Sequence, residues 1–419
     1  MKEINLRNII MGLQHTFVMF GATVLVPMLT GLDIGATLLA TGIGTLLFHL
    51  ITKNMVPIYL GSSFAFIAAI TSISANSGMP YALGGIFGAG VMFMLVGLLL
   101  NFISIESLHK ILPAWVTGPM IVLIGLILAP VAISNANGAT SPNLLNSIGT
   151  NGCWLLALST FGVSVFVKIY FEKIGLKFLS MLPVLISLVF GFVVSSLFGL
   201  IDWTAVSQAN WLGLPTFTSP KFSIKALSIT VPIALVAIVE HFGDVLAIGN
   251  VAGKDFLTKP GIHRTLFGDG VASCVSSAMG GPVLTTYSEN TGAVALTGNT
   301  NPIIMRFAAM FAIVLAFIPK FTELIKVIPG PVIGGISILL FGMISSIGIK
   351  NMIDAKVDFS NPKILIISAS MLVIGLGNAK FAYGNFQLEG LGLAAVVGML
   401  LNLVLNFKDI IGKNKKAIH

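Results

Sequence analysis

Residues 280–293 read GGPVLTTYSENTGA and lie inside a chain in which 56% of the residues are hydrophobic. The stretch carries two glycines, a proline, several hydroxyl groups and the carboxylate of Glu289. In hydrocarbon, irregular backbone is tolerated only where protein buries it or where it lines a cavity. We therefore predict a polar cavity here, built from an extended piece over residues 283–287 and a half-helix that begins near Ser288.

The composition is that of an integral membrane protein. Only 9% of the residues are charged, against about 25% in soluble domains. Apolar runs of about 17 to 25 residues recur from Ile9 to Phe407, and each can cross a hydrocarbon core of about 30 Å as a helix. The first run lacks a cleavage site followed by a mature domain, so it is predicted to be a retained helix. Cys153 and Cys274 fall in apolar segments and are expected to be packing residues, because two thiols alone make no disulfide framework.

Charged and Gly/Pro/Asn-rich breaks divide the chain into fourteen segments. They start near Ile9, Ile34, Pro57, Tyr81, Ile111, Gly149, Phe178, Lys225, His263, Pro282, Pro302, Val327, Pro362 and Leu388. If both termini are cytoplasmic, the outside loops keep only five of the 23 lysines and arginines, namely Lys221, Lys225, Lys320, Lys326 and Lys380. Cytoplasmic loops are the positively charged ones, so the net charge of +8 indicates orientation in a lipid bilayer rather than nucleic-acid binding.

An internal repeat relates the two halves of the chain. Gln14-His15 is echoed 226 positions later by Glu240-His241, and YLGSSFAF (59–66) by TTYSENTG (285–292). LPAWVTGPMIVLIGL (112–126) is answered 216 positions later by IPGPVIGGISILLFG. Seven crossings per half make the second copy enter from the opposite side, which is the inverted repeat of many secondary transporters. The alternative is a chance match of Gly, Pro and Leu in apolar sequence.

The third segment repeats the pattern of the tenth, because Pro57 is followed by the extended stretch IYLGSS and by a helix from Phe64. Two half-helices of opposite direction would then meet near the midplane with free N–H groups. The predicted fold is an all-α polytopic membrane protein with fourteen transmembrane segments in a 7+7 inverted repeat, and with short antiparallel strands and half-helices in segments 3 and 10. Close helix packing alone would explain the glycines, but it does not require Glu289.

Intramembrane acids are functional candidates by default. Glu240 and Asp244 stand four apart on an otherwise apolar helix and share one face. Desolvation and like charge both oppose ionisation of such a pair, so we expect one of them to hold an exchangeable proton. Asp269 is a third candidate, although it lies near a predicted segment end and could simply be solvated. His241 and His15 are expected either to orient nearby chain or to be ordinary core residues.

Two further observations bear on chemistry. HExxH is absent, and an HxxEH helix would need His at position 237, where the chain has Ala237, so no metalloprotease site is predicted. Phe64 opens the half-helix opposite Glu289, where its ring could stack on a flat ligand. Ordinary packing is the alternative for Phe64, since the chain has 29 phenylalanines.

At QHTFVMFGATVLVP, VPIYLGSSFAF, EHFGD, GKDFLTKPGIHRTLFGDG and TTYSENTG the sequence resembles the nucleobase/ascorbate transporter (nucleobase:cation symporter-2) family, most closely its bacterial uracil permease branch. The resemblance runs over essentially the whole chain. It implies a core domain of residues 1–107 and 225–322, holding segments 1–4 and 8–11. The implied gate domain comprises residues 108–224 and 323–419, with segments 5–7 and 12–14.

The resemblance also implies roles for individual residues. Glu240 and Glu289 look like the family's two substrate-binding acids, and Phe64 looks like its ring-stacking residue. Tyr287 and Ser288 would offer backbone groups at the strand-to-helix turn, where Ser288 replaces the usual glycine. Asp244 occupies a position where some uracil permeases carry a proton-coupling histidine and others an aspartate. We assign proton coupling to Asp244, Glu240 and Asp269, and supporting roles to His241, Gln14 and His15.

These residues predict a transporter and not an enzyme. Glu289 favours uracil, because an ionised carboxylate only accepts hydrogen bonds and uracil offers two ring N–H groups. The expected function is proton-coupled uracil import across a bacterial inner membrane by alternating access, with sodium less favoured, no cofactor or metal, and a homodimer compatible with the family. A purine symporter, for example for xanthine, is the first alternative. Others are an anion exchanger or channel of the same fold, and a receptor without transport.

Overall fold

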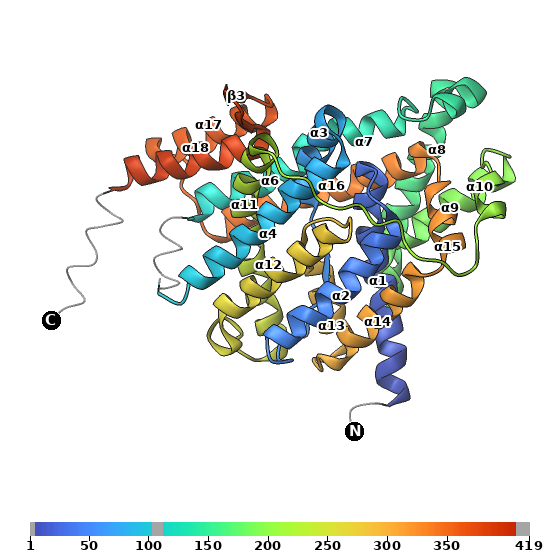
Figure 1. Ribbon diagram of the computed structural model, residues 1–419, viewed down its shortest axis with the longest axis horizontal. Coiled ribbons are helices and arrows are strands. Elements are labelled where there is room, and N and C mark those ends of the chain that lie inside the picture. Colours follow the sequence, from blue (N-terminus) through green and yellow to red (C-terminus); the bar gives the residue numbers. More distant parts are fainter. Residues whose placement is uncertain (1–4, 103–111, 408–419) are drawn as a thin grey trace.

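The computed structural model describes residues 5–102 and 112–407, most of them helical (Figure 1). The helices are α1 (Leu6–Thr30), α2 (Ile34–Ile51), α3 (Ile67–Ser77), α4 (Met79–Leu99), α6 (Ala114–Ile127), α7 (Ala129–Ala136), α8 (Pro142–Lys173), α9 (Pro183–Leu197), α10 (Thr204–Gln208), α11 (Ile224–Ala252), α12 (Ile262–Ala278), α13 (Ser288–Thr297), α14 (Ile303–Ala316), α15 (Pro319–Lys326), α16 (Gly330–Asp354), α17 (Pro362–Leu376) and α18 (Gly390–Leu405). Short helical turns are η1 (Phe64–Phe66), η2 (Leu179–Met181) and η3 (Leu257–Gly261). The strands are β1 (Leu60–Ser62), β2 (Leu284–Thr286), β3 (Lys380–Tyr383) and β4 (Phe386–Glu389).

The chain is an integral membrane protein. Within the described residues seven helices are long and apolar enough to cross a bilayer, or eight if α14 and α15, bent by 85°, count as one span. Most predicted segment starts lie close to the start of a helix, and the predicted break near Gly149 is a kink inside α8 with φ 67°. The predicted start near Ile111 lies outside the described residues. Because several helices are short, the count of fourteen crossings stays a prediction.

The helices pack in two sets. In the first set, α4 packs against α12 and α11, and α14 packs against α1 and α2. In the second set, α16 packs against α6, α7 and α8, and α17 against α18. In Figure 1, α17 and α18 lie at the upper left, and α8 and α9 lie at the right. Helix α11 also contacts α6 and α18, so it joins the two sets. The predicted division into core and gate domains stays a prediction.

Glycines allow α4 and α12 to approach each other closely. A Cβ at Gly90 of α4 would lie 2.9 Å from the carbonyl oxygen of Gly270 on α12. A Cβ at Gly270 would in turn lie 2.7 Å from the Gly90 carbonyl oxygen. Small residues allow such backbone approach in membrane bundles. Cys274 packs at the same contact, and both it and Cys153 are free, buried thiols.

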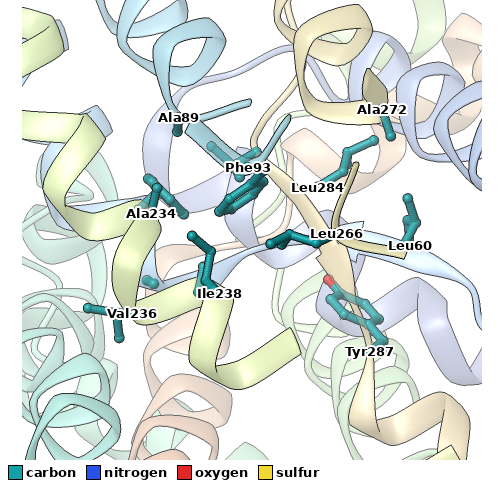
Figure 2. Packing of buried hydrophobic residues seen from close by; sticks show 14 of the residues in the cluster. Leu60, Ala89, Phe93, Ala234, Val236, Ile238, Leu266, Ala272, Leu284 and Tyr287 are labelled. Atoms are coloured by element: carbon teal, nitrogen blue, oxygen red, sulfur yellow. The ribbon is translucent and has the colours of Figure 1, made fainter. Parts of the chain in front are cut away.

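Two very short strands meet at the centre of the first set. Strand β1 pairs antiparallel with β2, with Leu60 opposite Thr286 and Ser62 opposite Leu284. Each strand is followed by a short helical segment, η1 and α3 after β1 and α13 after β2. We call residues 57–77 the first arm and residues 282–297 the second arm. Figure 2 shows Leu60 and Leu284 in the same buried cluster as Phe93 of α4 and Leu266 of α12. The predicted antiparallel strands in the third and tenth segments are confirmed.

Close approach explains one glycine in this pair. A Cβ at Gly61 would lie 2.1 Å from the ring of Tyr287, so only glycine leaves room for that ring. The Tyr287 hydroxyl donates a hydrogen bond to the carbonyl of Ser62 at 3.0 Å. The Tyr287 side chain of the second arm therefore packs on and hydrogen-bonds to the backbone of the first arm.

A second strand pair, the β3–β4 hairpin, lies between α17 and α18 and was not predicted from the sequence. Lys380 pairs with Glu389 and Tyr383 with Phe386, so the turn consists of Gly384 and Asn385. Gly384 adopts a positive φ of 59°, as two-residue hairpin turns require. The hairpin lies between two long apolar segments, and each of its strands has only four residues, so the alternation is too short to predict a strand.

Candidate functional site

The irregular backbone of the first arm is held by side chains from α1 and α2. Thr45 on α2 accepts a hydrogen bond from the Leu60 backbone N–H at 3.0 Å. Ser62 donates to the carbonyl of Thr23 on α1 at 3.1 Å. A ring nitrogen of His49, which is fully buried on α2, lies 2.9 Å from the Ile58 carbonyl. These bonds replace the helical ones that the broken segment lacks.

The second arm is held mainly by α12. Ser273 accepts from the Leu284 backbone N–H and contacts the Leu284 carbonyl, both at 3.0 Å. Ser276 donates to the carbonyl of Pro282 at 2.6 Å. Asn290, in the first turn of α13, donates to the Pro57 carbonyl at 3.0 Å and thereby ties the second arm to the first. Paired backbone and buried hydroxyls make both arms a fixed frame.

Three of the predicted acids lie around this frame. Asp244 on α11 is buried and accepts a hydrogen bond from the Thr286 hydroxyl of β2 at 2.9 Å. Glu240 lies one helical turn before Asp244, and Glu289 lies in the first turn of α13. The carboxyls of Glu240 and Glu289 interact electrostatically, and each also acts on Asp244. The structure therefore brings Glu240, Asp244 and Glu289 together, and all three come from the second half of the chain.

Asp269 and His241 form a separate buried pair beside these acids. Asp269 Oδ2 lies 2.8 Å from His241 Nδ1, and both side chains are only 1% exposed. The second ring nitrogen of His241 lies 2.9 Å from the Thr265 hydroxyl. The expectation that Asp269 could be a solvated residue at a segment end is wrong, because α12 begins at Ile262 and places Asp269 two turns inside. His241 is a bonded partner and not a lone core histidine.

Phe64 opens η1 and borders a cavity of about 460 Å³, which we call the α3 cavity. The α3 cavity is lined by Phe64, Ser72, Ile124, Pro130, Asn378 and Glu389, among others, and so lies between α3 and elements of the second helix set. The Phe64 ring packs edge-on to Phe341 of α16, with centroids 6.4 Å apart. The η1 turn that carries Phe64 also contacts α11, the helix of Glu240 and Asp244.

Gln14 and His15 lie at a second cavity, beside α13. This α13 cavity measures about 110 Å³ and is also lined by Phe178, Met181 and Leu296. His15 is buried beside Asn290, although neither ring nitrogen has a hydrogen-bond partner among the described residues. Gln14 and His15 therefore contact α13, and their supporting role stays a prediction.

Tyr287 and Ser288 stand at the predicted strand-to-helix turn. Tyr287 is extended and buried, and it is the residue before α13. Ser288 is the first residue of α13, and its side chain lies outside the part of the structure that is described. The strand-to-helix turn therefore lies at these residues, and their role in binding stays a prediction.

Four polar residues of the site region were missed. Thr286 bonds to Asp244, and Thr265 bonds to His241. Glu389 accepts a hydrogen bond from Ser72 of α3 at 2.8 Å and is buried at the start of α18. The one available signal was Glu389 itself, an acid directly before an apolar run. The threonines carried none, because hydroxyls are frequent in this chain.

Comparison with known proteins identifies the family. A xanthine/uracil permease family model, described as "Permease family", matches residues 6–382. The chain is 40% identical over 411 residues to the "Uracil permease" of Paenibacillus larvae, covering 96% of this chain and 95% of that protein. It is 40% identical over 402 residues to the "Uracil permease" of Bacillus subtilis, covering 94% of this chain and 91% of that protein.

The fold is also found in a solved structure. The transmembrane domain of a cyanobacterium bicarbonate transporter, BicA, superposes with a TM-score of 0.63 at 18% sequence identity. The match covers 96% of this chain and 98% of that one. At this identity the likeness concerns the fold alone. The family match over residues 6–382 and the relatives at 40% identity show that the chain belongs to the permease family of nucleobase:cation symporters that its motifs resemble.

Proposed function

We propose that this protein imports uracil across a bacterial inner membrane together with protons. The observation that carries the proposal is the group of carboxylates, Glu240, Asp244 and Glu289, beside a broken-helix frame in a chain whose relatives are named uracil permeases. Transporter sites typically lie where discontinuous helices meet. The acids can supply hydrogen-bond acceptors, and the backbone N–H groups at the starts of η1 and α13, which both contact α11, can supply donors.

Uracil complements this arrangement. Its two ring N–H groups are donors for Glu240 and Glu289, since ionised carboxylates only accept. Its two carbonyls are acceptors for backbone N–H groups at the starts of η1 and α13. Phe64 stacks on the pyrimidine face, and Tyr287 and Ser288 hold the backbone of the turn. Glu240 and Asp244, with Asp269 behind them, exchange the coupled proton, because neutralising a buried acid lowers the free energy needed to close the site.

The proposed topology is fourteen segments in two inverted halves with both termini in the cytoplasm. The antiparallel pairing of β1 with β2 supports it, because inverted copies bring equivalent strands together in opposite directions. The packing of the helices in two sets supports the proposed division into core and gate domains. In this orientation the α3 cavity opens outward and the α13 cavity inward, and movement of the core against the gate would expose them alternately.

Two other functions are weighed against this one. A purine symporter would use the same frame, and Asp244 and Asp269 suit it equally. An anion exchanger is suggested by the shared fold with a bicarbonate transporter. Three mutually interacting carboxyls at the site oppose an anion by direct repulsion, so the nucleobase proposal is favoured.

Uptake of labelled uracil into membrane vesicles tests the proposal. Accumulation above the external concentration that collapses with a protonophore is the expected result. Simple equilibration indicates a channel, and accumulation of bicarbonate instead of uracil contradicts the proposal. A competition series with uracil, thymine, xanthine and hypoxanthine against one labelled substrate separates the pyrimidine from the purine function.

A further inference from the structure

We propose that Thr265, His241 and Asp269 form a one-proton switch that stores the coupled proton beside the binding site. This inference rests on the proposed proton-coupled function and names the residues that load and release the proton. All three side chains are buried, and they form a chain of contacts from α12 to α11 and back to α12. Direct substrate contact is not required of any of them.

The switch follows from counting hydrogens. A threonine hydroxyl has one hydrogen to donate, and Thr265 Oγ1 has two acceptors within reach. The Ile262 carbonyl lies at 3.0 Å and His241 Nε2 lies at 2.9 Å. The hydroxyl can donate to only one of them at a time. Its choice fixes the proton on the imidazole.

In the first state Thr265 donates to the Ile262 carbonyl. His241 Nε2 must then carry a hydrogen and donate it to Thr265 Oγ1. The 2.8 Å contact between His241 Nδ1 and Asp269 Oδ2 needs another proton, either on the ring or on the carboxyl. The His241–Asp269 pair is then neutral overall.

In the second state Thr265 turns and donates to a bare His241 Nε2. The single ring hydrogen then sits on Nδ1 and is donated to an ionised Asp269, so the pair carries one negative charge. The Ile262 carbonyl keeps its helical partner, because an α-helix bonds each carbonyl to the N–H four residues later. Both states satisfy the contacts of His241 with Asp269 and with Thr265, and they differ by one proton and the rotation of one hydroxyl.

The switch is connected to the acids of the site through β2. Thr286 donates its hydroxyl to Asp244, and its backbone N–H lies beside the Asp269 carboxyl. The carboxyls of Asp244 and Asp269 also interact electrostatically. Since like charges repel, the charge of the pair and the protonation of Asp244 are linked.

Among the described residues, other ionisable groups lie close to the switch. Glu240 and Asp244 lie on α11 itself, and Glu289 on α13 acts on both of them. Thr265 lies one turn closer than Asp269 to the start of α12. In the proposed topology, this end of α12 is the cytoplasmic end. The direction from Asp244 through Asp269 and His241 to Thr265 is therefore the direction of import.

The first half of the chain supplies a natural contrast. His15, the repeat counterpart of His241, lies beside the amide of Asn290 rather than a carboxylate. An amide does not ionise, so it cannot exchange a proton with a ring nitrogen as a carboxylate can. His241, in the half that holds the acids, therefore has a titratable partner, whereas its counterpart His15 has an amide beside it.

The test compares Thr265→Val with Thr265→Ser in vesicles. Valine keeps the shape but can neither donate to nor accept from His241, whereas serine keeps both functions. Two quantities are measured for each variant, namely proton-driven uracil accumulation and the exchange of labelled for unlabelled uracil. Exchange needs no net proton movement, so it reports binding and domain movement alone.

We expect Thr265→Val to lower accumulation relative to exchange by about tenfold, which corresponds to one hydrogen bond to a charged group, and Thr265→Ser to restore it. The pH midpoint of accumulation should move by about one unit in Thr265→Val only. A Thr265→Val protein with the wild-type ratio and pH profile overturns the switch. If Thr265→Val does not reach the membrane, Thr265→Ala replaces it, with the same two outcomes. Failure of the wild-type protein to accumulate uracil would instead refute the proposed function.

Discussion

The two arms of the site share a backbone plan but differ in chemistry. Each arm consists of a three-residue strand followed by a short helical segment, and the strands pair with each other. The first arm is uncharged, presents Phe64 and borders the larger α3 cavity. The second arm carries Glu289, is packed against Glu240 and Asp244 on α11, and borders the smaller α13 cavity. An inverted repeat therefore determines where the helices are interrupted, while the side chains of each half can differ in chemistry.

The repeated Gln-His and Glu-His dipeptides show the same divergence. Gln14 and His15 meet the α13 cavity and Asn290, whereas Glu240 and His241 meet Glu289 and Asp269. In a low-dielectric interior, charge placed on one side of a symmetric frame gives a ligand a single orientation. We infer that the first arm supplies shape and stacking, and that the second supplies hydrogen-bond acceptors and protons.

Removing a charge from the second arm should have the largest effect. Glu289→Gln and Glu240→Gln should each lower uracil uptake at low substrate concentration by about 10- to 150-fold, the loss expected for a hydrogen bond to a charged group. Initial uptake rates, normalised to the amount of protein in the membrane, provide the measurement. Glu172→Gln, at an exposed position on α8, is the matched control and should transport normally. Wild-type uptake by well-expressed Glu289→Gln would remove its assignment.

Disturbing the contact between the arms should destabilise the fold. Gly61→Ala forces a Cβ to within 2.1 Å of the Tyr287 ring, and such overpacking costs about 1–3 kcal/mol. Thermal unfolding of the detergent-purified protein measures the change. Gly162→Ala is the control, because a Cβ there meets nothing within 4 Å. Equal stability of the two variants would show that the strand pair is not held as described.

The contact between the first arm and the second helix set should have a smaller effect. Ser72 on α3 donates to Glu389, and Ser228 on α11 accepts from the backbone N–H of Gln387 in the β3–β4 hairpin. Ser72→Ala should favour opening of the α3 cavity by about fivefold, since one hydrogen bond contributes about 1 kcal/mol.

The opening can be followed at Ala68, which lines the α3 cavity. The rate at which a water-soluble maleimide labels Ala68→Cys should rise about fivefold when Ser72→Ala is added. The native thiols are buried and provide a low background. Ser159→Ala, which removes a hydroxyl on α8 outside this contact, should leave the labelling rate unchanged. An unchanged labelling rate after Ser72→Ala is added would show that the hydrogen bond from Ser72 to Glu389 does not control opening of the α3 cavity.

Trimming the ring of the first arm should have the smallest effect. Phe64→Leu should weaken uracil binding a few-fold, because an aromatic contact adds about 0.5–1.5 kcal/mol beyond burial. Equilibrium binding to the purified protein measures it, with the half-exposed Phe166 changed to Leu as the control. A loss as large as that of Glu289→Gln would mean that the first arm contributes more than stacking.

The sequence predicted the frame better than the contacts within it. Glycine, proline and hydroxyl residues inside apolar runs marked both broken segments, because backbone in lipid cannot be irregular without a reason. Asp244 and Glu240 were found from their spacing on one helix. Their partners were not, because helix periodicity does not tell which residues of another helix face them.

The missed contacts join distant parts of the chain. Asp269 meets His241 across 28 positions, and Ser72 meets Glu389 across 317. The position of Asp269 was misjudged because a charged residue near a predicted boundary resembles a solvated one. The β3–β4 hairpin was missed because its strands are only four residues each and largely exposed.

The central claim is that acids of the second arm accept the two ring N–H groups of uracil. The most direct measurement is equilibrium binding of uracil, 1-methyluracil and 3-methyluracil to the wild-type protein, Glu240→Gln and Glu289→Gln. We predict that both methylations weaken wild-type binding by tenfold or more, and that each acid variant removes the penalty for one of the two methyl groups. Methyl penalties that stay the same in all three proteins would contradict the account.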